Sequence, residues 1–191
     1  MSGSESSGNE MPEVLSNTIP YDDGWARLNL DKLRFPDGSE GPRIWLELLF
    51  PFVCNIVPVL PSGDVVLVEV YRHPVRRWLL ELPGGLGEVG ETPETSALRE
   101  LKEETGLDAG HITKLGLVNV DPGILSHDTY VFRAEDCSGW DADHSDSADQ
   151  IIRVVSYPMA EVERRILAGE IVHGPMLIAL YLDKLERERA G

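Results

Sequence analysis

The segment from residue 82 to residue 107, LPGGLGEVGETPETSALRELKEETGL, constrains the fold more than any other part of this chain. It carries signals for both ends of a helix, because Thr92 suits the N-cap, Pro93 the first helical position and Gly106 the position after the last turn. Small and apolar side chains recur at helical spacing at Ala97, Leu98, Leu101 and Thr105. The segment therefore predicts a capped, amphipathic helix that follows a glycine-rich loop.

The same helix is expected to bring three carboxylates together, because Glu100, Glu103 and Glu104 stand at positions i, i+3 and i+4. Like charges at this spacing destabilise a helix by roughly 0.2–0.5 kcal/mol per pair. A hard divalent cation would reverse this effect, since Mg²⁺ and Mn²⁺ prefer carboxylate oxygens. The alternative is an acidic solvent face, because glutamate is a good helix former, and for a glutamate-rich helix taken alone this alternative is favoured.

The loop ahead of the helix changes that balance towards metal binding. Its glycines permit close backbone approach and positive φ, and they stand at Gly84, Gly85, Gly87 and Gly90. Glu88 and Glu91 add two more carboxylates immediately before the helix. The loop and the helix together therefore combine close backbone approach with a high density of oxygen ligands.

Loop and helix together resemble the Nudix box. That motif reads Gly, five residues, Glu, seven residues, Arg-Glu, an aliphatic residue, any residue, Glu-Glu, any residue, Gly and an aliphatic residue, and this chain has the same spacing. The matching positions are Gly85, Glu91, Arg99, Glu100, Leu101, Glu103, Glu104, Gly106 and Leu107. Every fixed position is filled, which makes the resemblance far more specific than a glycine-rich loop alone.

The Nudix resemblance implies a metal-dependent hydrolase of nucleoside diphosphates linked to another group, with an α/β fold that forms an α/β/α sandwich around a mixed sheet. The implied ligands of Mg²⁺ or Mn²⁺ are Glu100, Glu103, Glu104 and the backbone carbonyl of Gly84. The three glutamates are also candidate catalytic residues. Arg99 is implied to pair with Glu91 and to orient the ligands, and the alternative is an ordinary surface ion pair that contributes little.

Composition limits the classes of partner. Seventeen Lys and Arg against thirty-three Asp and Glu give a formal net charge of −16, which argues against nucleic acid or an anionic membrane as the main ligand. Two cysteines, Cys54 and Cys137, are too few for a disulfide framework, and no apolar run is long enough to cross a bilayer. The polar, acidic N-terminus resembles neither a secretory nor a transit peptide, so a cytoplasmic location is expected.

At 191 residues, the chain suits one domain with a sizeable core and a short N-terminal extension. Residues 1–24 are expected to form a disordered acidic tail, and residues 25–50 an antiparallel strand pair, 26–35 and 43–50, that helps to form a dimer. In the Nudix domain, residues 51–191, strands are expected at 52–60, 65–71, 112–120, 129–133 and 151–157, and helices at 158–167 and 175–189. The strands 52–60 and 65–71 are expected to pair with each other.

Flanking features resemble the ADP-ribose pyrophosphatase branch of the family. Pro122 lies fifteen residues beyond Leu107, a spacing that marks this branch, although a turn-forming proline needs no substrate. The segment EVYRHPVRRWLLELPGG is similar to the sequence that precedes the box in this branch, where an arginine corresponding to Arg72 lies near the substrate phosphates. Hydrolysis of ADP-ribose, a small-molecule nucleotide, would yield AMP and ribose 5-phosphate.

The branch also implies a homodimer with exchanged N-terminal strands, in which an aromatic side chain holds the adenine. Trp45 and Trp25 are the candidates, because an indole offers a large stacking face. The alternative for either tryptophan is a hydrophobic anchor within one subunit.

Two positions depart from the branch. Members often have Pro-Ala-Gly where this chain has Pro83-Gly84-Gly85, a change that leaves the carbonyl ligand in place. The branch also carries a catalytic glutamate before a late strand resembling IIRVV, where this chain has Asp149 and Gln150. Glutamine cannot act as a general base, so if Gln150 occupies the place of that glutamate, the base must be Asp149, Asp146 or a box glutamate. The alternative for each aspartate is a solvated, flexible loop.

Two other functions stay open on the sequence. One is a Nudix hydrolase that acts on another nucleotide sugar, a dinucleoside polyphosphate or an oxidised nucleotide. The other is a non-catalytic module that binds a nucleotide and regulates a partner. The intact set of box glutamates argues against a pure binding module, because binding alone does not need them, whereas Gln150 keeps that function open.

Overall fold

Residues 10–140 and 151–190, which this computed structural model describes, divide between two units. The larger unit contains Phe50–Val120 and the chain from Asp128 onwards. The smaller unit contains the N-terminal part of the chain up to Leu49, together with Asp121–His127. Among the described residues, no helix is both long and apolar enough to span a bilayer.

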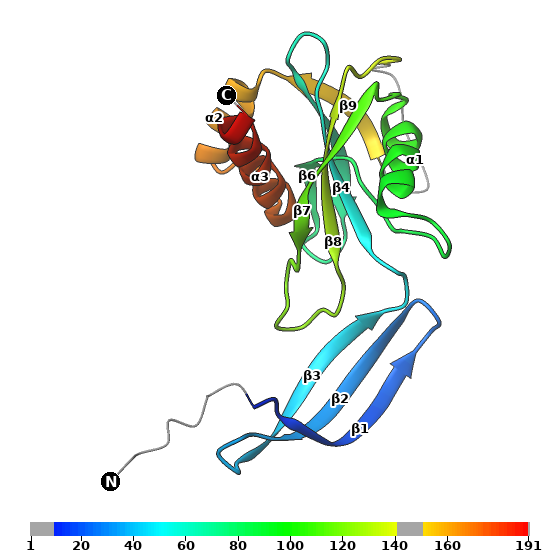
Figure 1. Cartoon of the computed structure of the whole chain (residues 1–191), viewed down its shortest axis with the longest axis vertical. Coiled ribbons are helices and arrows are strands. Elements are labelled where there is room, and N and C mark those ends of the chain that lie inside the picture. The colour runs from blue at the N-terminus through cyan, green and yellow to red at the C-terminus, as the bar shows by residue number, and fades with distance from the viewer. Residues whose placement is uncertain (1–9, 141–150, 191) are drawn as a thin grey trace. The chain divides into compact units, whose positions relative to one another are not determined.

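The strands of the larger unit form two three-stranded sheets (Figure 1). One sheet has the order β4-β8-β7, formed by Val53–Pro58, Thr129–Glu135 and His111–Val118. The other has the order β6-β5-β9, formed by Arg77–Glu81, Val65–Arg72 and Ile151–Tyr157. Strand β4 runs parallel to β8, whereas β7 is antiparallel to β8, and both β6 and β9 are antiparallel to β5.

Helices cover both sides of these sheets (Figure 1). The helices are α1 (Pro93–Thr105), α2 (Met159–Leu167) and α3 (Gly174–Ala190). Successive buried residues of β8 face opposite sides, because Phe132 packs in the cluster that contains Leu101 of α1, whereas Val131 packs with Val162 of α2 and Met176 of α3. The predicted α/β/α sandwich with a mixed sheet is confirmed.

The predicted pairing between the first two strands of this unit is wrong. Strands β4 and β5 share only the bridge between Val59 and Val65, and beyond it they join different sheets. The physical reason is burial: Cys54, Ile56 and Val57 are fully buried, so consecutive residues of β4 need cover on both faces rather than one solvated face. Strand β6 is a further element that the sequence analysis does not predict.

The smaller unit contains an antiparallel sheet of β1 (Glu13–Asp22), β2 (Ala26–Arg34) and β3 (Glu40–Leu48). The expectation of a disordered tail is therefore wrong for residues 13–22, and the expected strand pair has a third member. Strand β1 consists mostly of exposed residues, many of them polar, so it lacks the apolar pattern that identifies a half-buried strand. Its conformation depends on backbone pairing with β2, which runs from Glu13 opposite Arg34 to Asp22 opposite Arg27.

The register of this sheet separates an apolar face from a polar face. Leu28 pairs with Leu46, and Leu30 pairs with Ile44, on one side of the sheet. The intervening residues point to the other side, where Asn29 is opposite Trp45 and Asp31 is opposite Arg43. The polar face therefore carries the tryptophan that the sequence analysis selects as a candidate for stacking.

Candidate active site

The Nudix helix α1 has the predicted ends. The Thr92 side chain accepts from the backbone N–H of Thr95 at 3.2 Å, while the Thr95 hydroxyl accepts from the backbone N–H of Thr92 at 3.0 Å. Pro93 occupies the first turn, and Gly106 adopts the left-handed conformation with φ 72° and donates to the Lys102 carbonyl at 2.9 Å. These local contacts fix where the helical spacing of the glutamates begins and ends.

The glycine-rich loop presses its backbone against two buried carboxylates of this helix. The backbone N–H of Gly84 donates to Oε2 of Glu104 at 2.7 Å. A Cβ atom at Gly85 would lie 2.4 Å from the carboxyl carbon of Glu100, so no larger residue fits there without movement. Glu100 and Glu104 are only 7% and 5% exposed, which makes them the buried part of the glutamate cluster.

Arg99 links one buried carboxylate of the cluster to two more exposed ones. Its Nε donates to Glu91 at 2.9 Å, and its Nη1 donates to Glu100 at 2.8 Å and to Glu103 at 2.9 Å. Its Nη2 donates to the backbone carbonyl of Leu86 at 3.0 Å. The hydrogen bond from Arg99 is the largest of the causes that lower the pKa of Glu91 to about 2. The predicted pairing of Arg99 with Glu91 is confirmed, and the guanidinium also offsets repulsion among the glutamates.

These residues suit a hard divalent cation by their donor chemistry. Gly84, Glu100 and Glu104 come together and offer backbone and carboxylate oxygens, whereas the half-exposed Glu103 is directed to Arg99. No set of three or more His, Cys, Asp or Glu side chains within residues 10–140 and 151–190 is already gathered as a metal cage. Metal ligation by Gly84, Glu100, Glu103 and Glu104 therefore stays a prediction.

Arg72 lies in an ion-paired network that the sequence analysis did not find. Its Nε and Nη2 donate to the two carboxylate oxygens of Glu81, at 2.9 and 2.8 Å. Glu81 is only 1% exposed, and Nε2 of His173 lies 3.2 Å from its Oε2 atom. Burial is the main cause of a lowered pKa of His173. The available signal was a single carboxylate within the apolar run WLLELP at the end of β6.

Two candidates for the general base lie outside the box. Asp146 and Asp149, with Gln150 beside them, fall outside the described residues. The base therefore stays a prediction among these aspartates and the box glutamates.

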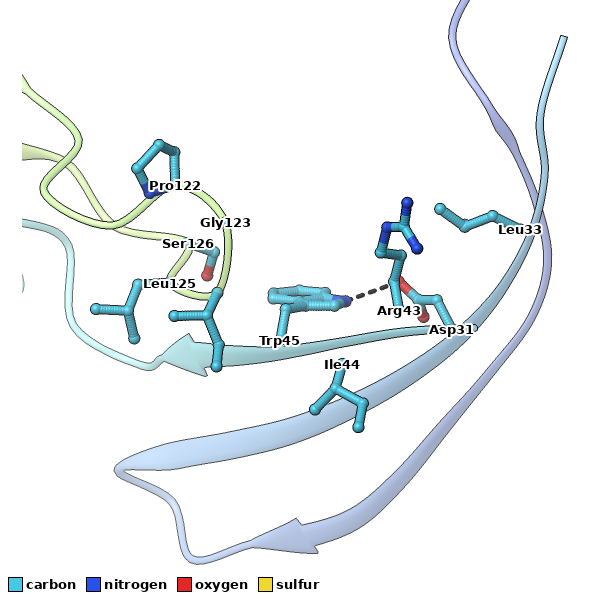
Figure 2. A pocket seen from close by; sticks show the side chains of 10 residues that line it. Asp31, Leu33, Arg43, Ile44, Trp45, Pro122, Gly123, Leu125 and Ser126 are labelled. Carbon is cyan, nitrogen blue, oxygen red and sulfur yellow. Dashed lines mark hydrogen bonds between the residues drawn. The ribbon is translucent and has the colours of Figure 1, made fainter. Parts of the chain in front are cut away.

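A pocket in the smaller unit brings together two residues that the sequence analysis selects for substrate binding. The cavity has a volume of about 430 Å³ and is lined by Asp31, Leu33, Arg43, Ile44, Trp45 and residues 122–126. Trp45 and Pro122 therefore line one pocket, although they are far apart in the sequence (Figure 2). The backbone N–H of Leu46 donates to the carbonyl of Ile124 at 2.7 Å, which holds the proline-containing segment beside β3.

The indole of Trp45 has a fixed orientation in this pocket. Its Nε1–H donates to Oδ2 of Asp31 at 2.7 Å (Figure 2). The side-chain amide of Asn17 in β1 donates to Oδ1 of the same carboxylate at 2.6 Å. Three neighbouring strands therefore contribute to holding the indole. Trp25, the other candidate, does not line this pocket and is 55% exposed.

Comparison with known proteins agrees with the box and with its branch. The NUDIX domain model matches residues 51–177. The ADP-ribose pyrophosphatase of Mycobacterium tuberculosis is 35% identical over 165 residues, which cover 84% of this chain and 77% of that protein. The ADP-ribose pyrophosphatase of Bacillus subtilis is 28% identical over 164 residues, which cover 85% of this chain and 88% of that protein.

A solved structure supports the same fold. The crystal structure of an ADP compounds hydrolase superposes with a TM-score of 0.81, covering 95% of this chain and 97% of its own, at 21% sequence identity. At that identity the likeness concerns the fold alone. The family match over residues 51–177 and the relative that is 35% identical carry the assignment: this chain belongs to the Nudix family.

Proposed function

We propose that this chain hydrolyses the pyrophosphate bond of ADP-ribose, or of a related nucleoside diphosphate sugar, to give AMP and ribose 5-phosphate in the case of ADP-ribose. The observation that carries the proposal is a complete Nudix box, with Glu100 and Glu104 buried against the glycine-rich loop, in a chain whose similar relatives include ADP-ribose pyrophosphatases. The buried carboxylates supply the charge that a metal-assisted hydrolase needs, and the relatives supply the substrate class.

Nudix hydrolases generally use a divalent metal, and we propose Mg²⁺ or Mn²⁺ here. Glu100, Glu104 and the carbonyl of Gly84 would hold it, with Glu103 joining from the more exposed side. A bound divalent ion lowers the pKa of water and neutralises charge on phosphate oxygens. This requirement also explains how a chain of net charge −16 would accept an anionic substrate.

Side chains of this chain would supply the general base and a phosphate contact. Water attacks one phosphorus, the bridging P–O bond breaks, and a carboxylate removes the proton from the attacking water. The candidates for this base are Asp149, Asp146 and the box glutamates, among which Glu103 is more exposed than Glu100 and Glu104. The guanidinium of Arg72, fixed by Glu81, would contact a phosphate through charge-assisted hydrogen bonds.

The pocket of the smaller unit would hold the adenine. Its volume of about 430 Å³ falls within the usual range for ligand pockets, roughly 300–1,000 Å³. The indole of Trp45 offers a stacking face, and the bond to Asp31 orients it. Pro122 supplies a rigid wall on the opposite segment.

The decisive experiment is a substrate panel with Mg²⁺ or Mn²⁺, with products identified by mass. ADP-ribose should yield AMP and ribose 5-phosphate, and a chelator should abolish the reaction. The panel includes a nucleotide sugar, a dinucleoside polyphosphate and an oxidised nucleotide. Turnover of one of these with ADP-ribose left intact would reject the proposed substrate, and binding without turnover of any of them would favour a regulator.

We further propose that the chain acts as a cytoplasmic homodimer in which the N-terminal strands help to build the substrate site. Support comes from the apolar face of the smaller sheet, where Leu30 and Ile44 are opposite each other and are 37% and 56% exposed. Light scattering should give about twice the monomer mass of 21.2 kDa. Leu30→Lys should shift the chain towards monomer, whereas Lys32→Leu should not. A wild-type monomer with full ADP-ribose affinity would reject the dimer.

Deleting residues 1–42 removes β1, β2 and the start of β3. It should lower the affinity for ADP-ribose more than the affinity for Mn²⁺, because the deleted strands carry Asp31 but no box residue. Equal losses of both affinities would argue that the N-terminal strands are needed for the fold rather than for the substrate.

A further inference from the structure

The network of Arg72, Glu81 and His173 has a geometry that pure stabilisation does not require. Glu81 is 1% exposed, yet the side chain of Arg72 that pairs with it is half exposed. The pair is bidentate, because Nε and Nη2 of Arg72 form hydrogen bonds of 2.9 and 2.8 Å with the two carboxylate oxygens of Glu81. Desolvating a carboxylate is costly, and apolar residues of similar volume often stabilise a fold at least as well as a buried ion pair does. What the pair provides is a fixed direction for the guanidinium.

His173 restrains the same carboxylate from a third element. It immediately precedes α3, and its backbone carbonyl accepts from Leu177 at 3.1 Å. Because a carboxylate only accepts hydrogen bonds, a neutral His173 must carry its proton on Nε2, which lies 3.2 Å from Glu81. Its buried Nδ1 has no hydrogen-bond partner among the described residues, which favours the neutral form because a second N–H there would need an acceptor.

The glycine-rich loop follows in the chain shortly after Glu81, the residue that carries this anchored carboxylate. Glu81 ends β6, and three residues further along the chain Gly84 donates to Glu104. The intervening backbone is held to β4, because Ile56 N–H donates to the Pro83 carbonyl at 2.9 Å. A residue of extended chain spans about 3.3 Å, so the anchor of Arg72 lies on the order of 10 Å along the strand from Gly84. The direction of Arg72 and the position of the loop are therefore set by one restrained segment.

We propose that Glu81 is a positioning residue, which holds the guanidinium of Arg72 for a phosphate of the substrate while His173 holds Glu81. The inference rests on the proposed function, since it gives Arg72 a phosphate to contact. Glu81 itself touches no substrate in this proposal. It acts through Arg72, so its removal should matter only while Arg72 is present.

A double-mutant cycle with Glu81→Gln and Arg72→Gln tests this dependence. Glu81→Gln is nearly isosteric and should lower kcat/KM for ADP-ribose by roughly 10- to 100-fold, with both a fall in kcat and a rise in KM. Arg72→Gln should cost at least as much. Adding Glu81→Gln to Arg72→Gln should change kcat/KM by less than about twofold, although it should raise the thermal midpoint by removing a buried carboxylate that has lost its arginine partner.

Glu69→Gln is the matched control. Glu69 makes a comparable two-point pair with Arg153, at 2.7 and 3.3 Å, on the opposite face of β5 from Arg72. The Glu69→Gln variant should keep kcat/KM close to the wild-type value. Mn²⁺ affinity should be unchanged in every variant, because none removes a box carboxylate. Glu81→Asp, which keeps the charge, should recover part of the activity that Glu81→Gln loses.

The affinity of the same four proteins for inorganic pyrophosphate is also measured in the presence of Mn²⁺. This second readout does not depend on the identity of the nucleotide. If wild-type protein leaves ADP-ribose intact, the proposed function fails, and the pyrophosphate cycle still decides the role of Glu81. If wild-type protein is active and the losses of the two single variants multiply in the double variant, Glu81 does not act through Arg72. A Glu81→Gln variant with wild-type kcat/KM would equally overturn the inference.

Discussion

The Nudix box and the N-terminal sheet hold their candidate functional side chains in different ways. In the box, helical spacing puts Glu100 and Glu104 on one face, and a glycine-rich loop covers them. In the sheet, Trp45 is oriented by Asp31, which is in turn held by Asn17 on a third strand. Helical spacing can be read from a sequence, whereas the residues that meet across a sheet depend on register, and a one-residue slip reverses every face.

The largest expected effect tests the box, where local spacing determines the site. Glu104→Gln keeps an oxygen that can accept from Gly84, so the fold should persist, but it removes one negative charge from the metal site. Loss of several kcal/mol of charge stabilisation should slow turnover on the order of 10³-fold. Initial rates of ADP-ribose hydrolysis at saturating Mn²⁺ measure this loss of turnover directly.

The matched control for that variant lies on the same helix. Glu94→Gln changes an exposed glutamate in the first turn and should leave turnover near the wild-type value. Without metal, the thermal stability of Glu104→Gln should rise or stay level, because repulsion among the carboxylates falls. Near-normal turnover of Glu104→Gln at saturating metal would remove Glu104 from the site.

The next largest effect tests how closely the glycine-rich loop packs against β4 at Gly84. The related branch often has alanine at the position of Gly84, yet a Cβ atom there would lie 2.1 Å from the carbonyl oxygen of Cys54. Gly84→Ala should therefore destabilise the fold by roughly 1–3 kcal/mol through overpacking and should also lower turnover by displacing the bond to Glu104. Urea unfolding measures the first effect, and initial rates measure the second.

Gly174→Ala provides the comparison for Gly84→Ala. An added Cβ atom at Gly174, the first residue of α3, meets nothing within 4 Å, so this substitution introduces no overpacking. Its stability should be equal to or slightly above that of the wild type. If Gly84→Ala matches this control in both stability and turnover, the loop does not hold Gly84 against β4 as the structure has it.

Prediction from the sequence therefore succeeded where local signals suffice. Both ends of α1 follow from its capping residues, whereas the pairing of Glu91 with Arg99 was implied by the resemblance to the Nudix box. Strand β1 could not be found in this way, because its exposed residues give no apolar alternation. The pairing of β4 with β8 joins residues that are far apart in the sequence, and the contacts of Glu81 depend on three separate elements. Such contacts become predictable only once the topology is known.

A third, smaller effect tests the pocket of the sheet. Trp45→Ala should raise KM for ADP-ribose about tenfold, since stacking of a base on an aromatic ring contributes roughly 1–3 kcal/mol. Trp45→Phe keeps a stacking face but loses the donor to Asp31, so it should cost less. Trp25→Ala is the control, because Trp25 does not line the pocket. Equal KM values for the Trp45 and Trp25 variants would make Trp45 a hydrophobic anchor only.

The smallest expected effect concerns β1, the strand that the sequence did not reveal. The amide of Asn17 donates to Asp31 at 2.6 Å and to Asn29 at 3.0 Å, so Asn17→Ala should loosen the carboxylate that orients Trp45. A hydrogen bond contributes about 0.5–1.5 kcal/mol, and exposure of Asn17 places the effect at the lower end, or roughly a two- to threefold rise in KM. Thr18→Ala changes the neighbouring residue, whose partner Leu30 belongs to the apolar face, and should leave KM unchanged. In the Trp45→Phe background, Asn17→Ala should add almost nothing, because the indole donor is already gone. An equal rise in KM for Asn17→Ala with and without the indole would mean that β1 affects the pocket by a route other than Asp31.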